Sequence, residues 1–180
     1  MKIEKGEIIM RLFRKAMYLC LSLIVFSLVG CNSTSTENKL PASIPEDFNF
    51  VFNYGINAKN QLDTIKGEYT KDMVTDPSIT TSLKLSDEEM NTIYSEMKKI
   101  NILSYPKIFK PKSNAQQTPF DTYSIKIIAD GSEKNISWND ENVSEAKDAV
   151  QLRKLFKIIQ EIIINKDEFK KLPEPKNTYQ

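Results

Sequence analysis

Short stretches in which apolar and polar residues alternate predict the strands of a sheet. Every second residue from 48 to 54 is aromatic: Phe48, Phe50, Phe52 and Tyr54. Because the side chains of a strand point alternately to its two faces, these four rings would share the buried face of one strand. A second, weaker strand is expected over 61–69, with a bulge at Gly67, and a third over 79–85.

The same alternation returns later in the chain, over 121–129 and 133–139. Asp130-Gly131 lies between these stretches, and this dipeptide is typical of a tight β-hairpin, whose turn needs a positive φ at both positions. The two stretches are therefore expected to pair as an antiparallel hairpin, with Ile136 and Trp138 on one side of the second strand.

Two helices are predicted from apolar residues spaced three and four positions apart. Ser86 begins the first, since a serine followed three residues later by Glu89 forms a capping box. The apolar stripe of this helix consists of Met90, Ile93, Tyr94, Met97 and Ile100. The second helix is expected to be capped by Asn142 or Ser144 and to end near Asn165.

The order of these elements is three strands, a helix, a long loop, two strands and a final helix. It predicts a single α+β domain over 47–166, with one antiparallel sheet of about five strands packed by two helices on one face. The alternation agrees with this fold, because a sheet solvated on one face needs a polar residue at every second position. Residues 31–46 and 167–180 are expected to be a polar tether and a polar C-terminal tail.

The loop over 104–120 is the first candidate binding site. It contains three prolines, and loops of this length in compact domains are either functional or disordered. Its basic and aromatic side chains suit an anionic wall polymer or lipid headgroups, and the residues that carry this prediction are Lys107, Phe109, Lys110 and Lys112. The alternative is a solvated connection that packs Tyr105 and Phe109 onto the core.

A second candidate site is the polar region over 55–72, where Asn60 and Asp63 have hydrogen-bonding side chains. Asparagine and aspartate are equally typical of tight turns, where they bond to the backbone, so a structural role stands beside the binding role. The segment from Phe50 to Asp72 resembles a group of small lipoproteins of low-G+C Gram-positive bacteria. The motifs that carry this resemblance, which implies no function, are Tyr54-Gly55, Asn60, Leu62-Asp63-Thr64 and Tyr69-Thr70-Lys71-Asp72.

The first 30 residues have the pattern of an export signal. Three basic residues between Arg11 and Lys15 precede an apolar run over 16–29. The alternative is a transmembrane helix, but this run spans only about 21 Å at a helical rise of about 1.5 Å, whereas a hydrocarbon core measures about 30 Å. Initiation at Met10 instead of Met1 would remove two acidic residues from the signal.

The apolar run ends in Leu28-Val29-Gly30-Cys31, which resembles a bacterial lipobox. The resemblance implies that residues 1–30 are removed and that the sulfur of Cys31 receives fatty-acyl chains such as palmitate. These chains would anchor the mature protein in the lipid bilayer. The resemblance therefore also implies a location at the cell membrane, facing the extracytoplasmic side.

Composition excludes several classes of function. The chain has no histidine, and its two cysteines are Cys20 in the signal and Cys31, so histidine-based triads, thiolate nucleophiles and zinc sites with nitrogen or sulfur ligands are excluded. Because 5 of the 25 basic and 2 of the 24 acidic residues lie in the signal, the mature chain keeps 20 and 22. This near-neutral mixture argues against nucleic acid as a partner, and no cofactor or metal is expected.

These observations favour a non-enzymatic binding or interaction module at the cell envelope. Its partners would be the lipid bilayer, through acylated Cys31, and an envelope protein or an anionic wall polymer. One alternative is a small hydrolase or transferase that brings two carboxyl groups with raised pKa values into a cleft. Another is a small-ligand binding module, which needs an apolar pocket of at least about 300 Å³.

Overall fold

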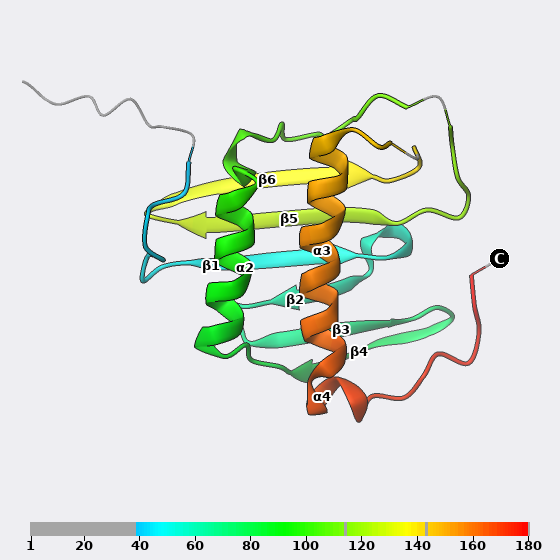
Figure 1. Cartoon of the computed structure of the whole chain (residues 1–180). Coiled ribbons are helices and arrows are strands. Elements are labelled where there is room, and N and C mark those ends of the chain that lie inside the picture. Colours follow the sequence, from blue (N-terminus) through cyan, green and yellow to red (C-terminus); the bar gives the residue numbers. More distant parts are fainter. Residues whose placement is uncertain (1–38, 114, 143, 180) are drawn as a thin grey trace, which may run out of the picture. The chain divides into compact units, whose positions relative to one another are not determined.

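The computed structural model describes residues 39–113, 115–142 and 144–179 and contains one antiparallel sheet with helices on one face. The strands are β1 (Asn49–Tyr54), β2 (Asn60–Asp63), β3 (Glu68–Met73), β4 (Asp76–Ser82), β5 (Thr122–Ala129) and β6 (Ser132–Asn139). The helices are α2 (Asp87–Lys99), α3 (Lys147–Asn165) and α4 (Asp167–Lys170), with short 3-10 turns at Ile56–Ala58 and Ile102–Ser104. From edge to edge the strand order is β4, β3, β2, β1, β5, β6, and α2 and α3 lie across one face (Figure 1). The predicted α+β class is confirmed.

The sheet has six strands because the stretch 61–69 folds into two strands, β2 and β3, and not into the single strand expected. The N–H of Gly67 donates to the carbonyl of Asp63 at 2.9 Å and closes the turn between them. Gly67 has a φ of 68°, which favours glycine, so it belongs to a tight turn and not to a bulge. Ile65 in this turn is 53% exposed, and this apolar residue concealed the turn in the sequence pattern.

The third predicted strand is displaced along the chain, since β4 covers 76–82 and not 79–85. The N–H of Leu83 donates to the carbonyl of Gly67 at 2.8 Å, and α2 begins four residues later. Leu83 is buried and Leu85 packs against the core, although neither belongs to the strand. The alternate spacing of Leu83 and Leu85 therefore made the strand pattern of the sequence continue into the segment between β4 and α2.

The core lies between the sheet and the two long helices. Phe52 of β1 is fully buried, and its ring centroid lies 4.9 Å from that of Phe156 on α3. The ring of Phe156 also lies 4.8 Å from that of Tyr123 on β5, so one side chain of α3 joins two neighbouring strands. The alternating aromatic residues of β1 thus face the helices, as their spacing predicts.

The other face of the sheet is polar. The strand register places six uncharged hydrogen-bonding side chains opposite one another across the sheet: Thr80, Thr70, Gln61, Asn53, Ser124 and Ser137. Such residues are expected on a sheet face that is left to solvent. The described helices all lie on the opposite side, which accounts for the alternation along the strands (Figure 1).

The two helix caps have different outcomes. The capping box of the first helix is confirmed, because Ser86 Oγ accepts the N–H of Glu89 at 3.3 Å and the Glu89 carboxylate accepts the N–H of Ser86 at 2.7 Å. The cap predicted for the second helix, Asn142 or Ser144, is wrong, because Ala146 is the N-cap residue of α3. The hydroxyl of Ser144 accepts the N–H of Ala146 and orders the turn before the helix.

Part of the expected tether packs against the domain. Leu40 is buried, and the hydroxyl of Tyr94 on α2 lies 2.9 and 3.1 Å from the carbonyl oxygens of Pro41 and Ser43. These residues therefore belong to the folded unit. The predicted signal and Cys31 lie outside the described residues, and within the described ranges no helix is long and apolar enough to cross a membrane.

The expected polar tail also contacts the domain. Phe169 of α4 packs against Tyr69 of β3, with ring centroids 5.5 Å apart. The ammonium group of the buried Lys71 lies 5.0 Å from the Phe169 ring and 3.0 Å from the carboxylate of Glu174. Phe169 and Leu172, which both pack against the core, are too few to establish a periodic pattern in a polar segment, which is why the sequence pattern did not show this packing.

Replacing Ser86 with alanine removes the side-chain acceptor of the capping box. We expect Ser86→Ala to lower the free energy of unfolding by about 1 kcal/mol. Ser95→Ala is the matched control, because Ser95 is exposed within the same helix and caps nothing. Urea unfolding can be followed by the fluorescence of Trp138, the only tryptophan of the chain. Equal stability of the two variants would contradict the role of the cap.

Candidate binding site

The segment 105–113, here called the basic loop, follows the outer edge of β6. The N–H of Phe109 donates to the carbonyl of Ser137 at 2.8 Å, and the N–H of Ser137 donates to the carbonyl of Lys107 at 2.8 Å. Ile108 and Ser137 thus form a short parallel bridge. The basic loop is therefore held to the sheet by backbone hydrogen bonds.

Two aromatic side chains of the basic loop are buried against the core. Tyr105 and Phe109 are each 5% exposed, and their ring centroids lie 5.3 Å apart. The Phe109 ring also meets Trp138 edge-on at 5.2 Å. Burial, aided by Asp148, raises the pKa of Tyr105 to about 12, so its hydroxyl stays protonated and donates to the carbonyl of Asp148 at 2.9 Å. The rings of Tyr105 and Phe109 thus pack onto the core, as the structural alternative for this loop predicts.

The charged side chains of the basic loop are the three predicted lysines. Lys107, Lys110 and Lys112 are exposed, and their ammonium groups have no ion-pair or hydrogen-bond partner among the described residues. Glu141 and Asp148 line the hollows beside the basic loop, but neither forms an ion pair with these lysines. The ammonium groups of the three lysines repel each other. They remain available for an anionic partner.

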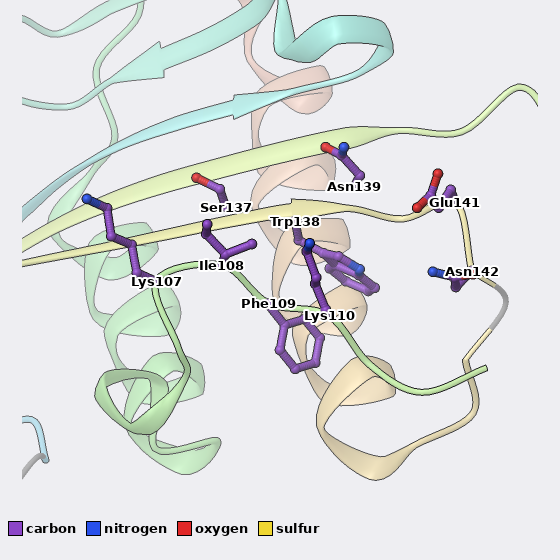
Figure 2. A pocket seen from close by; sticks show the side chains of 9 residues that line it. All are labelled: Lys107, Ile108, Phe109, Lys110, Ser137, Trp138, Asn139, Glu141 and Asn142. Atoms are coloured by element: carbon purple, nitrogen blue, oxygen red, sulfur yellow. The ribbon is translucent and has the colours of Figure 1, made fainter.

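A pocket of about 510 Å³ opens where the basic loop leaves β6. Figure 2 shows the loop beside the strand at Ile108 and then diverging from it, with Glu141 and Asn142 at the far end. The pocket is lined by Lys107, Ile108, Phe109, Lys110, Ser137, Trp138, Asn139, Glu141 and Asn142. A second hollow, of about 460 Å³, shares Ile108, Phe109 and Lys110 with the first and is also lined by Ala146 and Asp148.

An ion pair supports the far wall of the pocket. Arg153 of α3 donates from Nε and Nη2 to the two carboxylate oxygens of Asp140, each at 2.6 Å, and from Nη1 to the carbonyl of Ser144 at 2.6 Å. The hydrogen bonds to Asp140 raise the pKa of Arg153, and the Asp140 side chain is only 6% exposed. The guanidinium also lies 5.0 Å from the ring centre of Trp138. The chain that follows β6 is therefore held against α3.

Trp138 has an unusual position in this wall. Its side chain is buried and lines the pocket, and its Nε1–H has no hydrogen-bond partner among the described residues. The sequence pattern placed Trp138 with Ile136 on one side of the second hairpin strand, and it assigned Asn139, Glu141 and Asn142 to no binding site. Only the pairing of the basic loop with β6 brings these residues together, and no local sequence signal reports that pairing.

The other two candidate residues lie elsewhere. Asn60 and Asp63 belong to β2, which β1 and β5 separate from β6. Asn60 Oδ1 accepts the N–H of Asp72 at 3.0 Å, and Asp63 Oδ1 accepts the N–H groups of Ile65 and Lys66 at 3.0 and 3.1 Å. Both side chains thus support strand and turn geometry, the structural role that turn chemistry predicts.

Two carboxyl groups, those of Asp47 and Glu89, have lowered pKa values. Two backbone N–H groups lower the pKa of Asp47, with Gly131 the stronger donor. Burial alone would raise the pKa of Glu89, but Lys166 and the N–H of Ser86 together lower it. A general acid needs the opposite shift. Within the described ranges no group of three or more acidic side chains is placed to hold a metal ion.

Comparison with known proteins adds no relative. No protein-family model and no curated protein sequence matches the chain. The functional argument therefore rests on the residues of the basic loop and the pocket beside it.

The ion pair of the pocket wall should respond asymmetrically to mutation. Arg153→Gln leaves the buried carboxylate of Asp140 without its ionic partner, and we expect a loss of about 3 kcal/mol in the free energy of unfolding. Asp140→Asn leaves Arg153, whose side chain is 30% exposed and can be hydrated, so the expected loss is only about 1 kcal/mol. Urea unfolding of both variants measures the difference. Equal losses would contradict this assignment.

Proposed function

We propose that the chain is an extracytoplasmic lipoprotein, anchored in the cell membrane through acylated Cys31, whose domain binds an anionic partner at the cell envelope without catalysing a reaction. The observation that carries this proposal is the basic loop, which presents three lysines without acidic partners among the described residues. The lipobox-like ending at Cys31 supports the location. Anchoring by acyl chains is stable when two or more chains insert.

The fixed shape of the basic loop favours binding. Its backbone is already bonded to Ser137, and its two aromatic side chains are already buried, so less conformational entropy is lost when a partner binds. Each lysine close to an anionic surface contributes about 1 kcal/mol, and this attraction fades beyond a Debye length of about 8 Å. A partner must therefore touch this edge of the sheet to gain from it.

The anchor is tested by labelling cells with a clickable fatty acid. We expect the wild-type chain to incorporate the label and Cys31→Ser to remain an unlabelled, uncleaved precursor, because the sulfur that accepts the lipid is absent. Cys20→Ser is the matched control and should be labelled normally, since Cys20 lies inside the removed signal. Undiminished label in Cys31→Ser would refute the anchor.

The binding surface is tested by removing the charges of the basic loop. Lys107→Gln, Lys110→Gln and Lys112→Gln together should weaken binding of the purified full-length protein to isolated cell envelope by about 100-fold at low salt, from about 1 kcal/mol per lysine. The measurement is co-sedimentation over a range of envelope concentrations. Raising the salt concentration should have the same effect as the mutations.

A matched control keeps the net charge equal. Lys154, Lys157 and Lys171 are exposed and lie outside the basic loop, and their replacement with glutamine changes the charge by the same amount. We expect this variant to bind like the wild type and both variants to unfold at nearly the same urea concentration, because exposed lysines contribute little to stability. Equal weakening by both triple variants would show a general charge effect and reject the basic loop as the binding surface.

A further inference from the structure

The outer edge of β6 is closed by the basic loop at Ser137 and open two residues later. Ser137 uses both its N–H and its C=O for the basic loop. The pairing of β6 with β5 is unbroken up to Asn139, and in an antiparallel strand every second residue directs its backbone groups to the same edge. The N–H and C=O of Asn139 therefore point outward like those of Ser137. Thr122, opposite Asn139, accordingly sends its own N–H to the carbonyl of Gly55 on the far side.

This open edge is short. The basic loop leaves β6 after Phe109, and Pro111 has no N–H with which to continue the pairing. Beyond Asn139 the edge is covered again, because Gln117 donates its N–H to the carbonyl of Glu141 at 2.8 Å. Among the described residues no backbone hydrogen bond is made to Asn139 from this side. A continuous strand cannot run past both contacts, whereas the end of a chain can enter between them.

The pocket at this opening suits an anionic group. Lys107 and Lys110 line it against the single carboxylate of Glu141, so its charged side chains are positive on balance. Trp138 lies in the same wall, its indole N–H has no hydrogen-bond partner among the described residues, and an entering acceptor would supply one. Ile108 is 62% exposed at the pocket and offers an apolar surface to a neighbouring side chain.

We propose that this pocket binds the C-terminal end of a peptide chain. The N–H and C=O of the penultimate residue of the peptide pair with the C=O and N–H of Asn139, the terminal carboxylate faces Lys110 and the indole N–H of Trp138, and the last side chain lies on Ile108. Capture of a terminal carboxylate beside a free strand edge is a known mode of peptide recognition. The inference rests on the proposed function and names the partner as a protein or peptide of the envelope.

Two other occupants fit less well. An amino terminus would bring a positive charge toward the two lysines. A phosphate-linked sugar polymer supplies negative charge, but the N–H and C=O of a sugar acetamido group point in opposite directions and cannot both bond to the backbone of Asn139. A peptide end supplies both the charge and the pair.

The fluorescence of Trp138 reports on this pocket, because the chain contains no other tryptophan. The full-length protein in detergent is titrated with N-acetyl-alanyl-alanine, with the C-terminal amide of the same dipeptide, and with N-acetylglucosamine. We expect a saturable change with the free acid, at least about tenfold weaker binding of the amide, which lacks the charge-assisted hydrogen bonds, and no change with the sugar. Equal binding of acid and amide, no response to the acid, or a saturable response to the sugar would overturn the proposal.

Two variants test the contacts. Asn139→Pro removes the outward N–H, a change that an edge strand tolerates, whereas Asn139→Ala keeps it. Lys110→Gln removes one charge, and Lys154→Gln is its control on the exposed side of α3. We expect Asn139→Pro and Lys110→Gln each to weaken dipeptide binding about tenfold, as for the loss of one charge-assisted or backbone hydrogen bond, and the two controls to bind normally. If Asn139→Pro shows no cooperative urea transition, Lys110→Gln against Lys154→Gln decides, and equal binding by these two overturns the proposal.

Co-sedimentation separates this inference from the proposed function. One outcome would overturn the peptide-end proposal and leave the proposed function standing. In it, binding to the envelope depends on the lysines, but the free-acid dipeptide neither competes with that binding nor changes the fluorescence of Trp138. A dipeptide response without lysine-dependent envelope binding would instead reject the proposed function. Competition of the free acid, but not of the amide, with envelope binding is the result that supports both.

Discussion

The two backbone hydrogen bonds that join Ser137 to Lys107 and Phe109 determine the arrangement of the whole β6 edge. They hold the basic loop in place, so that one side of it packs Phe109 against Trp138 while the other presents lysines to solvent. They also set the point at which the loop must diverge from the strand, and the pocket opens at that point. Loss of this pairing would free the loop, the pocket wall and the charged surface together.

The two edges of the sheet are protected in different ways. Exposed strand edges invite pairing with other chains, and proteins counter this with proline, charge or a covering segment. On β6 the basic loop bonds the edge at Ser137. On β4 the exposed Pro77 lacks an N–H, and Lys176 from the C-terminal segment lies 3.1 Å from the carboxylate of the neighbouring Asp76. The opening at Asn139 is the part of the β6 edge that has the pocket beside it, which is why we regard it as a site.

The buried ion pair of Asp140 and Arg153 near this site costs desolvation free energy but orders the chain around it. Asp140 is taken out of water, and the two hydrogen bonds from Arg153 offset this only because they align with both carboxylate oxygens. The same guanidinium bonds the carbonyl of Ser144, so one side chain orders the segment between β6 and α3. That segment forms the far wall of the pocket. A hydrophobic pair in place of Asp140 and Arg153 would pack, but it would not hold the carbonyl of Ser144 in a defined geometry.

The parts of the fold that the sequence determined by itself are those in which the interacting residues are close in the chain. The capping box joins Ser86 and Glu89, three positions apart, and both Asp130 and Gly131 have the positive φ values that their hairpin turn requires. The aromatic alternation of β1 likewise reported its buried face, because period two is a local property of a strand.

Tertiary structure alone decided the features whose partners are far apart. The split of 61–69 depended on strand pairing across the exposed Ile65, and the packing of Phe169 on Tyr69 joins residues that no short pattern connects. The site shows the same contrast: the lysines were visible in the sequence, but Trp138 and Asn139 became their neighbours only through the bonds to Ser137. A backbone hydrogen bond can be made by almost any residue, so its partner leaves no mark on the sequence and is selected by the packing of the whole domain.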